Sequence, residues 1–204
     1  MLRMSFLTAG LCLLLSMFLV TGCLNDPEKK ETPVEEEPEF RDLTSKEDVI
    51  NNLVLSYAER NISEYSKLLL RNDDSYNGSD YQFSYYWYNQ PEDEELEAYL
   101  MRDEDIMATN NLFLAAQGTP AKLDHEILDD LTLEIGAGSW VAVSELFGEP
   151  CEDCWSTIRE YLISVSYGEN RLSGDDVIQI YIVPVDEGDK TIYKIALAKD
   201  IYVE

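Results

Sequence analysis

The sequence predicts an α+β domain, with helices in its first part and an antiparallel run of strands in its second. Apolar residues recur with a helical period of 3.6 from residue 50 to residue 69. From residue 131 to the C-terminus they alternate with a period of 2, and the turn at 186–189 reads as a hairpin loop. Segregation of the two patterns indicates α+β rather than alternating α/β architecture.

Two helices are expected to open the domain. Thr44 to Glu47 reads as a capping box, with Thr44 as N-cap and Glu47 reaching back. Asn61 is expected to cap the second helix, with Glu64 three residues on. The apolar faces of the two helices contain Ile50, Leu53, Val54, Tyr57 and Ala58, and then Ile62, Tyr65, Leu68 and Leu69.

An aromatic segment, residues 81–88, is expected to form a strand, since aromatic side chains favour strands. Pro91 is then expected to begin a further helix. Leu96, Tyr99 and Leu100 would start the buried stripe of that helix, which continues or restarts toward Phe113.

The C-terminal strands are expected at residues 131–135, 140–143, 161–167, 177–185 and 191–203. Residues 177–185 are apolar on both faces, which is typical of a central strand.

The helix pair, the aromatic strand and the long C-terminal strands cover most of residues 45–204. This pattern resembles the nuclear transport factor 2-like superfamily, also called cystatin-like cone folds. The resemblance implies a curved, mostly antiparallel sheet wrapped around helices, with a conical pocket between them. Superfamily enzymes such as ketosteroid isomerase and scytalone dehydratase use an acid or base inside that pocket.

No such catalytic residue is predicted here. Glu134 and Glu160 alternate with apolar neighbours and are expected to face solvent, and His125, the one histidine, precedes the first long strand. We therefore expect a non-catalytic domain that binds a small apolar ligand or an envelope protein. The alternatives are an isomerase- or hydrolase-like cone enzyme and a thiol–disulfide redox protein.

A targeting segment occupies residues 1–22. Arg3 precedes an apolar run from Leu11 to Val20, which is shorter than the roughly 20 residues of a membrane span and is typical of a signal peptide. Val20-Thr21-Gly22-Cys23 resembles a bacterial lipobox, which implies lipidation at Cys23; a plain secretory signal with a chance cysteine is the alternative. The expected location is the cell envelope, at the outer membrane of a two-membrane bacterium or otherwise the outer face of the cell membrane.

An acidic, proline-rich tether is expected at residues 23–41, before a single domain at 42–204. Residues 24–41 contain seven carboxylates and three prolines, and they have too little apolar surface to offset the entropy of ordering. Cys23 would connect this tether to membrane lipid.

The formal charge of −26 argues against nucleic acid, which proteins bind through Lys and Arg. We interpret the charge as a source of solubility and self-repulsion, with a cationic partner or divalent ions as the alternative. Residues 73–78 partly match a calcium loop, but Ser84 stands where its bidentate glutamate should be, so we predict a turn and no metal. No cofactor is predicted, and the oligomeric state stays open.

Cys151 and Cys154 form a C-x-x-C pair. An exported domain favours a small structural disulfide that closes a turn. Free thiols, a metal site and a redox site are the alternatives.

Aromatic residues supply the pocket prediction. Phe83, Tyr85 and Trp87 share one face of the expected strand, and Tyr57 lies on the apolar face of the first helix. They could line a ligand pocket or fill an ordinary core.

Overall fold

The computed structural model describes residues 39–74, 76–86, 97–118 and 130–201 of the 204-residue chain. These residues belong to one compact unit, Pro38–Glu204. The predicted signal peptide, Cys23 and most of the predicted tether lie outside the described residues. Within the described residues, no helix combines the length and apolar character needed to cross a membrane.

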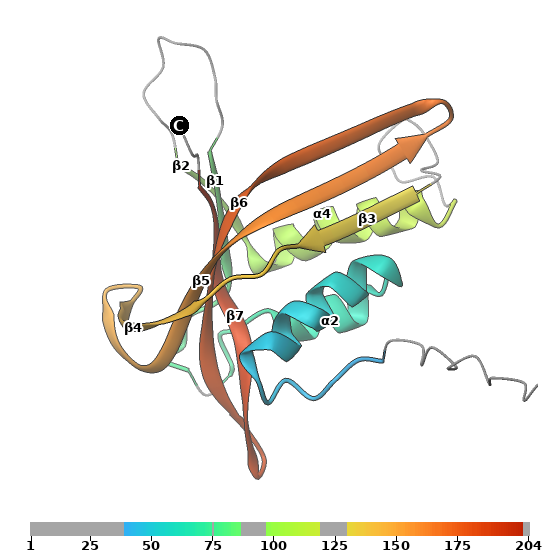
Figure 1. Cartoon of the computed structure of the whole chain (residues 1–204). Helices are drawn as coiled ribbons and strands as arrows, with labels where there is room; N and C mark the ends of the chain where they lie inside the picture. Colours follow the sequence, from blue (N-terminus) through green and yellow to red (C-terminus); the bar gives the residue numbers. More distant parts are fainter. Residues whose placement is uncertain (1–38, 75, 87–96, 119–129, 202–204) are drawn as a thin grey trace, which may run out of the picture. The chain divides into compact units, whose positions relative to one another are not determined.

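The described strands form one large sheet (Figure 1). Its path runs β2-β1-β7-β6-β5-β3, and β4 pairs with β5 off this path. Neighbours are antiparallel except β1 and β7, which are parallel. The strands are β1 (Gln82–Tyr86), β2 (Glu97–Met101), β3 (Asp130–Ile135), β4 (Trp140–Leu146), β5 (Glu149–Tyr167), β6 (Asn170–Glu187) and β7 (Lys190–Ile201).

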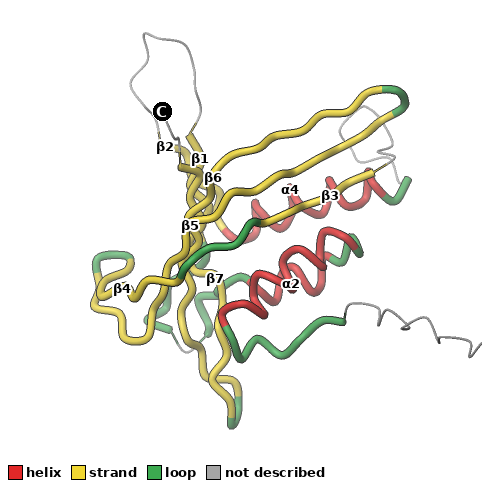
Figure 2. The backbone as a smooth tube through the Cα atoms, viewed as in Figure 1, coloured by secondary structure: helices red, strands yellow, loops and turns green. Residues whose placement is uncertain are grey.

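Three described helices pack against one face of this bent sheet (Figure 2). They are α2 (Lys46–Ala58), α3 (Ile62–Leu68) and α4 (Arg102–Ala116). Helix α2 contacts β3 and β7, whereas α4 contacts β1, β2 and β3. The core lies between the two layers and includes Val49, Leu68, Phe113, Leu131 and Ile180, all at most 1% exposed. The predicted α+β fold is therefore confirmed.

Of the two predicted N-caps, the one for α3 is correct and the one for α2 is not. The Asn61 side chain caps α3 by accepting a 3.1 Å hydrogen bond from the Glu64 amide, as predicted. Helix α2 is capped by Ser45 and not by Thr44, because the Ser45 hydroxyl accepts from the Asp48 amide at 3.2 Å. The predicted capping box at Thr44 was thus wrong by one residue.

Glu47 attaches α2 to the sheet instead of closing a capping box. Its Oε1 accepts hydrogen bonds of 2.7 Å from both Arg159 Nη2 and Trp140 Nε1. Burial alone would raise the pKa of Glu47, but these hydrogen bonds and the positive charge of Arg159 outweigh it and lower the pKa. The guanidinium of Arg159, a residue only 5% exposed, also lies 5.3 Å from the Trp140 ring centre. The pair therefore links the start of α2 to β4 and β5.

The predicted helix through Tyr99 and Leu100 was wrong, because residues 97–101 form strand β2. This strand pairs with β1 along its whole length, from Gln82 opposite Met101 to Tyr86 opposite Glu97. Its residues favour helices in isolation, yet cross-strand pairing decides the outcome in a sheet. The proposed helix start at Pro91 lies outside the described residues.

Strand β5 is much longer than the predicted 161–167, since it begins at Glu149. Its N-terminal part pairs with β4 and its C-terminal part with β3 along the same edge. Cys151 and Cys154 consequently lie within a strand, where the register against β4 shifts between Val143 and Glu145. The predicted turn around the cysteines was wrong; the pair spans a bulge, with Asp153 at a φ of 58°.

Candidate functional site

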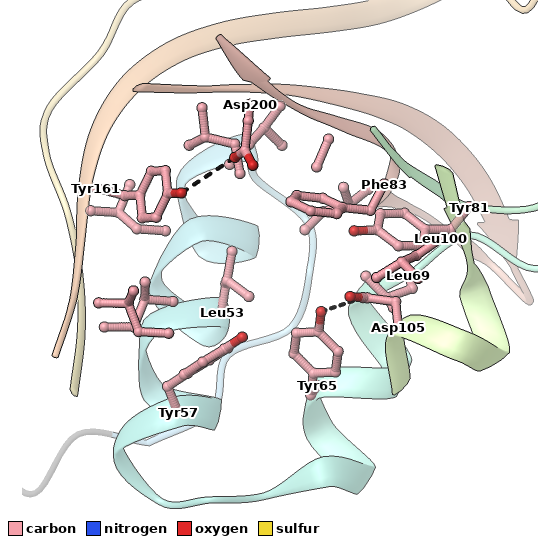
Figure 3. Close-up of a pocket in the computed structure, with 17 residues that line it drawn as sticks. Leu53, Tyr57, Tyr65, Leu69, Tyr81, Phe83, Leu100, Asp105, Tyr161 and Asp200 are labelled. Atoms are coloured by element: carbon pink, nitrogen blue, oxygen red, sulfur yellow. Dashed lines mark hydrogen bonds between the residues drawn. The ribbon is translucent and has the colours of Figure 1, made fainter. Parts of the chain in front are cut away.

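A cavity of about 540 Å³ lies between the helices and the inner face of the sheet (Figure 3). Its wall consists of eleven apolar side chains, four tyrosines and two aspartates. The polar members are Tyr57, Tyr65, Tyr81, Tyr161, Asp105 and Asp200; the apolar ones are Leu53, Leu69, Phe83, Leu100, Leu133, Ile135, Ile163, Ile178, Ile180, Ile195 and Ala198. This size and composition are typical of small-molecule sites.

Strand alternation brings the sheet residues of this wall together. Ile178 and Ile180 face inward from β6, and opposite Ile180 the next strand contributes Ala198. On the other side of β6, Tyr161 and Ile163 point inward from β5, opposite Ile135 and Leu133 of β3. The inner face is thus almost wholly apolar where it meets the cavity.

Asp105 is one of the two acids in the cavity wall and is only 8% exposed. It shares the buried stripe of α4 with Thr109 and Phe113, spaced four residues apart. The Tyr65 hydroxyl donates a 2.5 Å hydrogen bond to its Oδ2. Burial raises the pKa of Asp105, and the hydrogen bonds from Tyr65 and Tyr81 offset only part of that rise. The carboxyl is therefore held by tyrosines in an apolar setting.

Asp200 is the second acid, on β7, two residues after Ala198 and on the same inner face. The Tyr161 hydroxyl donates a hydrogen bond of 3.3 Å to its Oδ1. Burial raises the pKa of Asp200; the bond from Tyr161 lowers it and the nearby charge of Asp176 raises it. Figure 3 shows this pair at a separate part of the wall from the Tyr65–Asp105 pair.

The tyrosines of the cavity are neutral hydrogen-bond donors. Burial, followed by the charge of Asp105, raises the pKa of Tyr57 to about 12. Burial likewise raises the pKa values of Tyr65 and Tyr81. The Tyr57 ring packs edge-to-face on Tyr65 and Phe113, with ring centres 5.9 and 5.0 Å apart. These contacts fix the rings that carry the hydroxyls.

The structure places two of the four predicted pocket residues in this cavity wall, Tyr57 and Phe83. The side chain of Tyr85 and all of Trp87 lie outside what the structure describes. Glu134 and Glu160 are exposed, as expected. His125 is also outside the described residues.

Sequence reasoning missed both acids of the cavity. Asp105 stands in the acidic first turn of α4, where a carboxylate is usually explained by the helix dipole. Its spacing to Thr109 and Phe113 was the signal that placed it on the buried face. Asp200 is two positions after Ala198 in the expected last strand, so strand alternation places both on the same face. That spacing could have indicated that Asp200 faces inward.

A disulfide joins Cys151 and Cys154, which are 8% and 1% exposed. The Tyr76 hydroxyl lies 2.9 Å from Cys151 Sγ. Neither cysteine lines the cavity.

Acids elsewhere in the described ranges do not gather into a metal site: no group of three His, Cys, Asp or Glu residues is suitably placed there. In the calcium-like segment, both Asp73 oxygens accept 2.8 Å hydrogen bonds from Arg71. Lys194 Nζ lies 2.8 and 2.9 Å from the two Asp74 oxygens. These acids therefore pair with side-chain cations.

No family model matches the sequence, and no curated protein matches it. Solved structures with a related chain path include ActVI-ORFA from Streptomyces coelicolor, at 8% identity and a TM-score of 0.43, covering 75% of this chain and 90% of that one. The beta subunit of an aromatic-ring-hydroxylating dioxygenase from Novosphingobium aromaticivorans has 9% identity and a TM-score of 0.45, with 79% and 89% covered. A protein from Streptomyces avermitilis, described as a dehydratase of the NTF2-like family, has 10% identity and a TM-score of 0.43, with 76% and 92% covered.

Helices packed on the inner face of a bent, mostly antiparallel sheet, with a cavity between the layers, are the arrangement that the sequence resemblance implied. The nuclear transport factor 2-like resemblance is thus confirmed at the level of the fold. What the cavity can do follows from its own residues: it can enclose an apolar body and offer two carboxyl groups and several hydroxyls to polar substituents.

Proposed function

We propose that this protein is an exported lipoprotein, anchored in the cell envelope through lipid on Cys23, whose domain binds a small, mostly apolar molecule without transforming it. The observation that carries the binding role is the cavity of about 540 Å³ with its eleven apolar side chains. Support for the anchor is the lipobox-like sequence that ends at Cys23.

Ligand binding is tested by isothermal titration of the full-length protein in phosphatidylcholine nanodiscs, with the signal of empty nanodiscs subtracted. Tryptophol and 2-naphthol are suitable neutral bicyclic probes, because a cavity of this volume holds two fused rings. Leu133→Trp would fill the cavity from β3, and Leu172→Trp places the same side chain at a 60% exposed position. We expect binding to fall about tenfold or more in the first variant only. Equal binding by both variants would place the ligand elsewhere.

The anchor is tested by Cys23→Ser in a bacterial host. We expect the unchanged protein in the membrane fraction, with a diacylglycerol mass on residue 23. The variant should lose both. An unmodified Cys23 in a membrane-bound protein would contradict lipid anchoring.

Asp105 favours a second candidate, an isomerase- or hydrolase-like enzyme. A buried carboxyl with a raised pKa, beside two tyrosine hydroxyls, is a suitable general acid or base for such chemistry. Incubation of the protein with each bound compound, followed by mass spectrometry and proton-exchange NMR, separates the candidates. Turnover that Asp105→Asn abolishes, with binding retained, would establish the enzyme; unchanged compounds support a binding protein.

A further inference from the structure

The polar side chains of the cavity wall are either acidic or neutral. Asp105 and Asp200 supply two carboxyl groups, and no Lys, Arg or His among the described residues lines this wall. The tyrosine hydroxyls are neutral, since burial keeps the pKa values of Tyr57 and Tyr65 above the usual value. No positively charged side chain in the described wall could neutralise the charge of an anionic ligand, whereas a cationic ligand could pair with the two aspartates.

The two acids differ in how fully their oxygens are engaged. Asp105 is buried and takes the short bond from Tyr65 together with an interaction from Tyr81. Asp200 is half-buried, and the hydrogen bond that it accepts from Tyr161 is 3.3 Å long. A carboxylate accepts about four hydrogen bonds, so with respect to the described residues Asp200 has more of this capacity left for a ligand than Asp105.

Negative charge continues on the surface next to Asp200. An adjoining depression includes Glu134, Glu160, Asp175 and Asp176, and it shares Ile135 and Tyr161 with the cavity wall. The charge of Asp176 reaches Asp200, since it contributes to the raised pKa of that group. Clustered charge of one sign beside a cavity raises the local concentration of opposite ions.

We infer that the ligand of this cavity is an organic cation, with an aromatic or aliphatic body in the apolar wall and an ammonium group at Asp200. This inference rests on the proposed binding function and narrows its ligand class. The aromatic rings of the wall add to the attraction, because ammonium groups bind to the faces of tyrosine and phenylalanine. An anionic amphiphile, such as a fatty acid, is disfavoured by the same groups.

Three indoles of nearly equal size test the charge preference: tryptamine is a cation, tryptophol is neutral and indole-3-acetate is an anion. Each is titrated calorimetrically into the full-length protein in phosphatidylcholine nanodiscs. We expect tryptamine to bind about tenfold more tightly than tryptophol, from ion pairing combined with cation–π contact, and indole-3-acetate to bind most weakly.

Asp200→Asn should remove the preference for tryptamine and leave tryptophol affinity nearly unchanged. Asp189→Asn is the matched control, since it removes the same charge at an exposed turn between β6 and β7. Tryptophol binding as tight as tryptamine would overturn the cation inference and leave the binding function standing. A tryptamine preference that survives in Asp200→Asn would overturn the role of that residue. If no indole and no 2-naphthol binds, the proposed function fails, and the inference fails with it.

Discussion

The Tyr65 hydroxyl donates a 2.5 Å hydrogen bond to Asp105 Oδ2 across 40 positions of the chain. This bond connects α3 to α4 at the edge of the cavity, within a cluster of buried aromatic rings. Its two partners are a neutral donor and an acid that burial makes reluctant to ionise. The acid therefore depends on the tyrosine most when it is charged.

Tyr65→Phe should lower the free energy of unfolding by about 1–3 kcal/mol at pH 7, because it leaves a buried carboxyl without one of its donors. The loss should be smaller at pH 3, where the carboxyl is protonated. Urea unfolding at both pH values measures it. Tyr181→Phe is the control, since Tyr181 lies on β6 outside the cavity wall. A loss that is the same at both pH values would mean that packing, and not the charge of Asp105, explains the effect.

Asp105→Asn should flatten the dependence of stability on pH. The pKa of Asp105 is raised from 3.8 in the folded chain, so between that value and the folded pKa the folded chain binds more protons than the unfolded chain. The free energy of unfolding then falls as pH rises through this window, by about 1.4 kcal/mol for each unit of the shift. Asp200 acts in the same direction, so the slope should shrink without vanishing.

Thermal unfolding from pH 3 to pH 8 checks this expectation. Asp103→Asn is the matched control, two positions away with a side chain that is 94% exposed. Identical slopes for Asp105→Asn and the parent protein would show that the pKa of Asp105 is not raised.

Glu47→Gln should weaken the attachment of α2 to the sheet. The cost should be only about 1 kcal/mol at pH 7, because the Glu47 side chain is 54% exposed and solvent screens the pair. The pKa of Glu47 is lowered, so its contribution is present above the unfolded pKa and lost as pH falls through the folded pKa. Chemical denaturation at pH 7 and pH 3, with Glu145→Gln as control, should show a cost only at pH 7.

Gly138→Ala should be more costly than its size suggests. A Cβ there would lie 2.7 Å from Arg159 Cγ, from the Ile158 carbonyl oxygen and from Thr157 Oγ1. Overpacking of this kind typically costs about 1–3 kcal/mol. At Gly174, also opposite β5, the nearest atom would be 3.8 Å away. Gly174→Ala should therefore be nearly neutral in the same unfolding assay, and equal costs at both sites would argue against close packing at Gly138.

The Cys151–Cys154 disulfide should behave as a structural bond. The double change to alanine should cost about 2 kcal/mol, since a four-residue loop constrains little unfolded-chain entropy. With mild reductant and no denaturant, iodoacetamide should label neither cysteine, because the two residues are 8% and 1% exposed. Rapid labelling of the folded protein would instead revive a redox role.

Most helices and strands could be predicted from the spacing of apolar residues along the sequence. Period 2 located β3 and β7, whose inner faces are apolar where they meet the helices. The apolar runs at 140–143 and 177–185 located β4 and the C-terminal half of β6. It failed at β2, where Glu97 to Met101 have no strand preference and only pairing with β1 makes them extended. Strand pairing of this kind depends on a second segment, so it cannot be predicted from the local sequence alone.

Only the aromatic part of the candidate site could be predicted from the sequence. Large aromatic side chains on a predicted apolar face are recognisable in the sequence, so Tyr57 and Phe83 could be chosen as pocket residues. An acid such as Asp105 looks like an ordinary solvated residue until the tertiary fold buries its helix face. Its partner Tyr65 was assigned to the core, and the sequence held no sign that the two would meet.

The parallel pairing of β1 with β7 has a consequence for the order of assembly. Gln82 pairs with Leu197 and Ser84 with Lys199, so β1 waits for a partner more than a hundred residues further along the chain. Contacts of such long range form slowly, because the intervening loop must close first. During synthesis the N-terminal helices and β1 emerge well before β7 exists, so the sheet can be completed only when the last few residues have appeared. A chain still being synthesised would therefore keep an unpaired β1 edge, open to chaperones and proteases, until β7 has emerged.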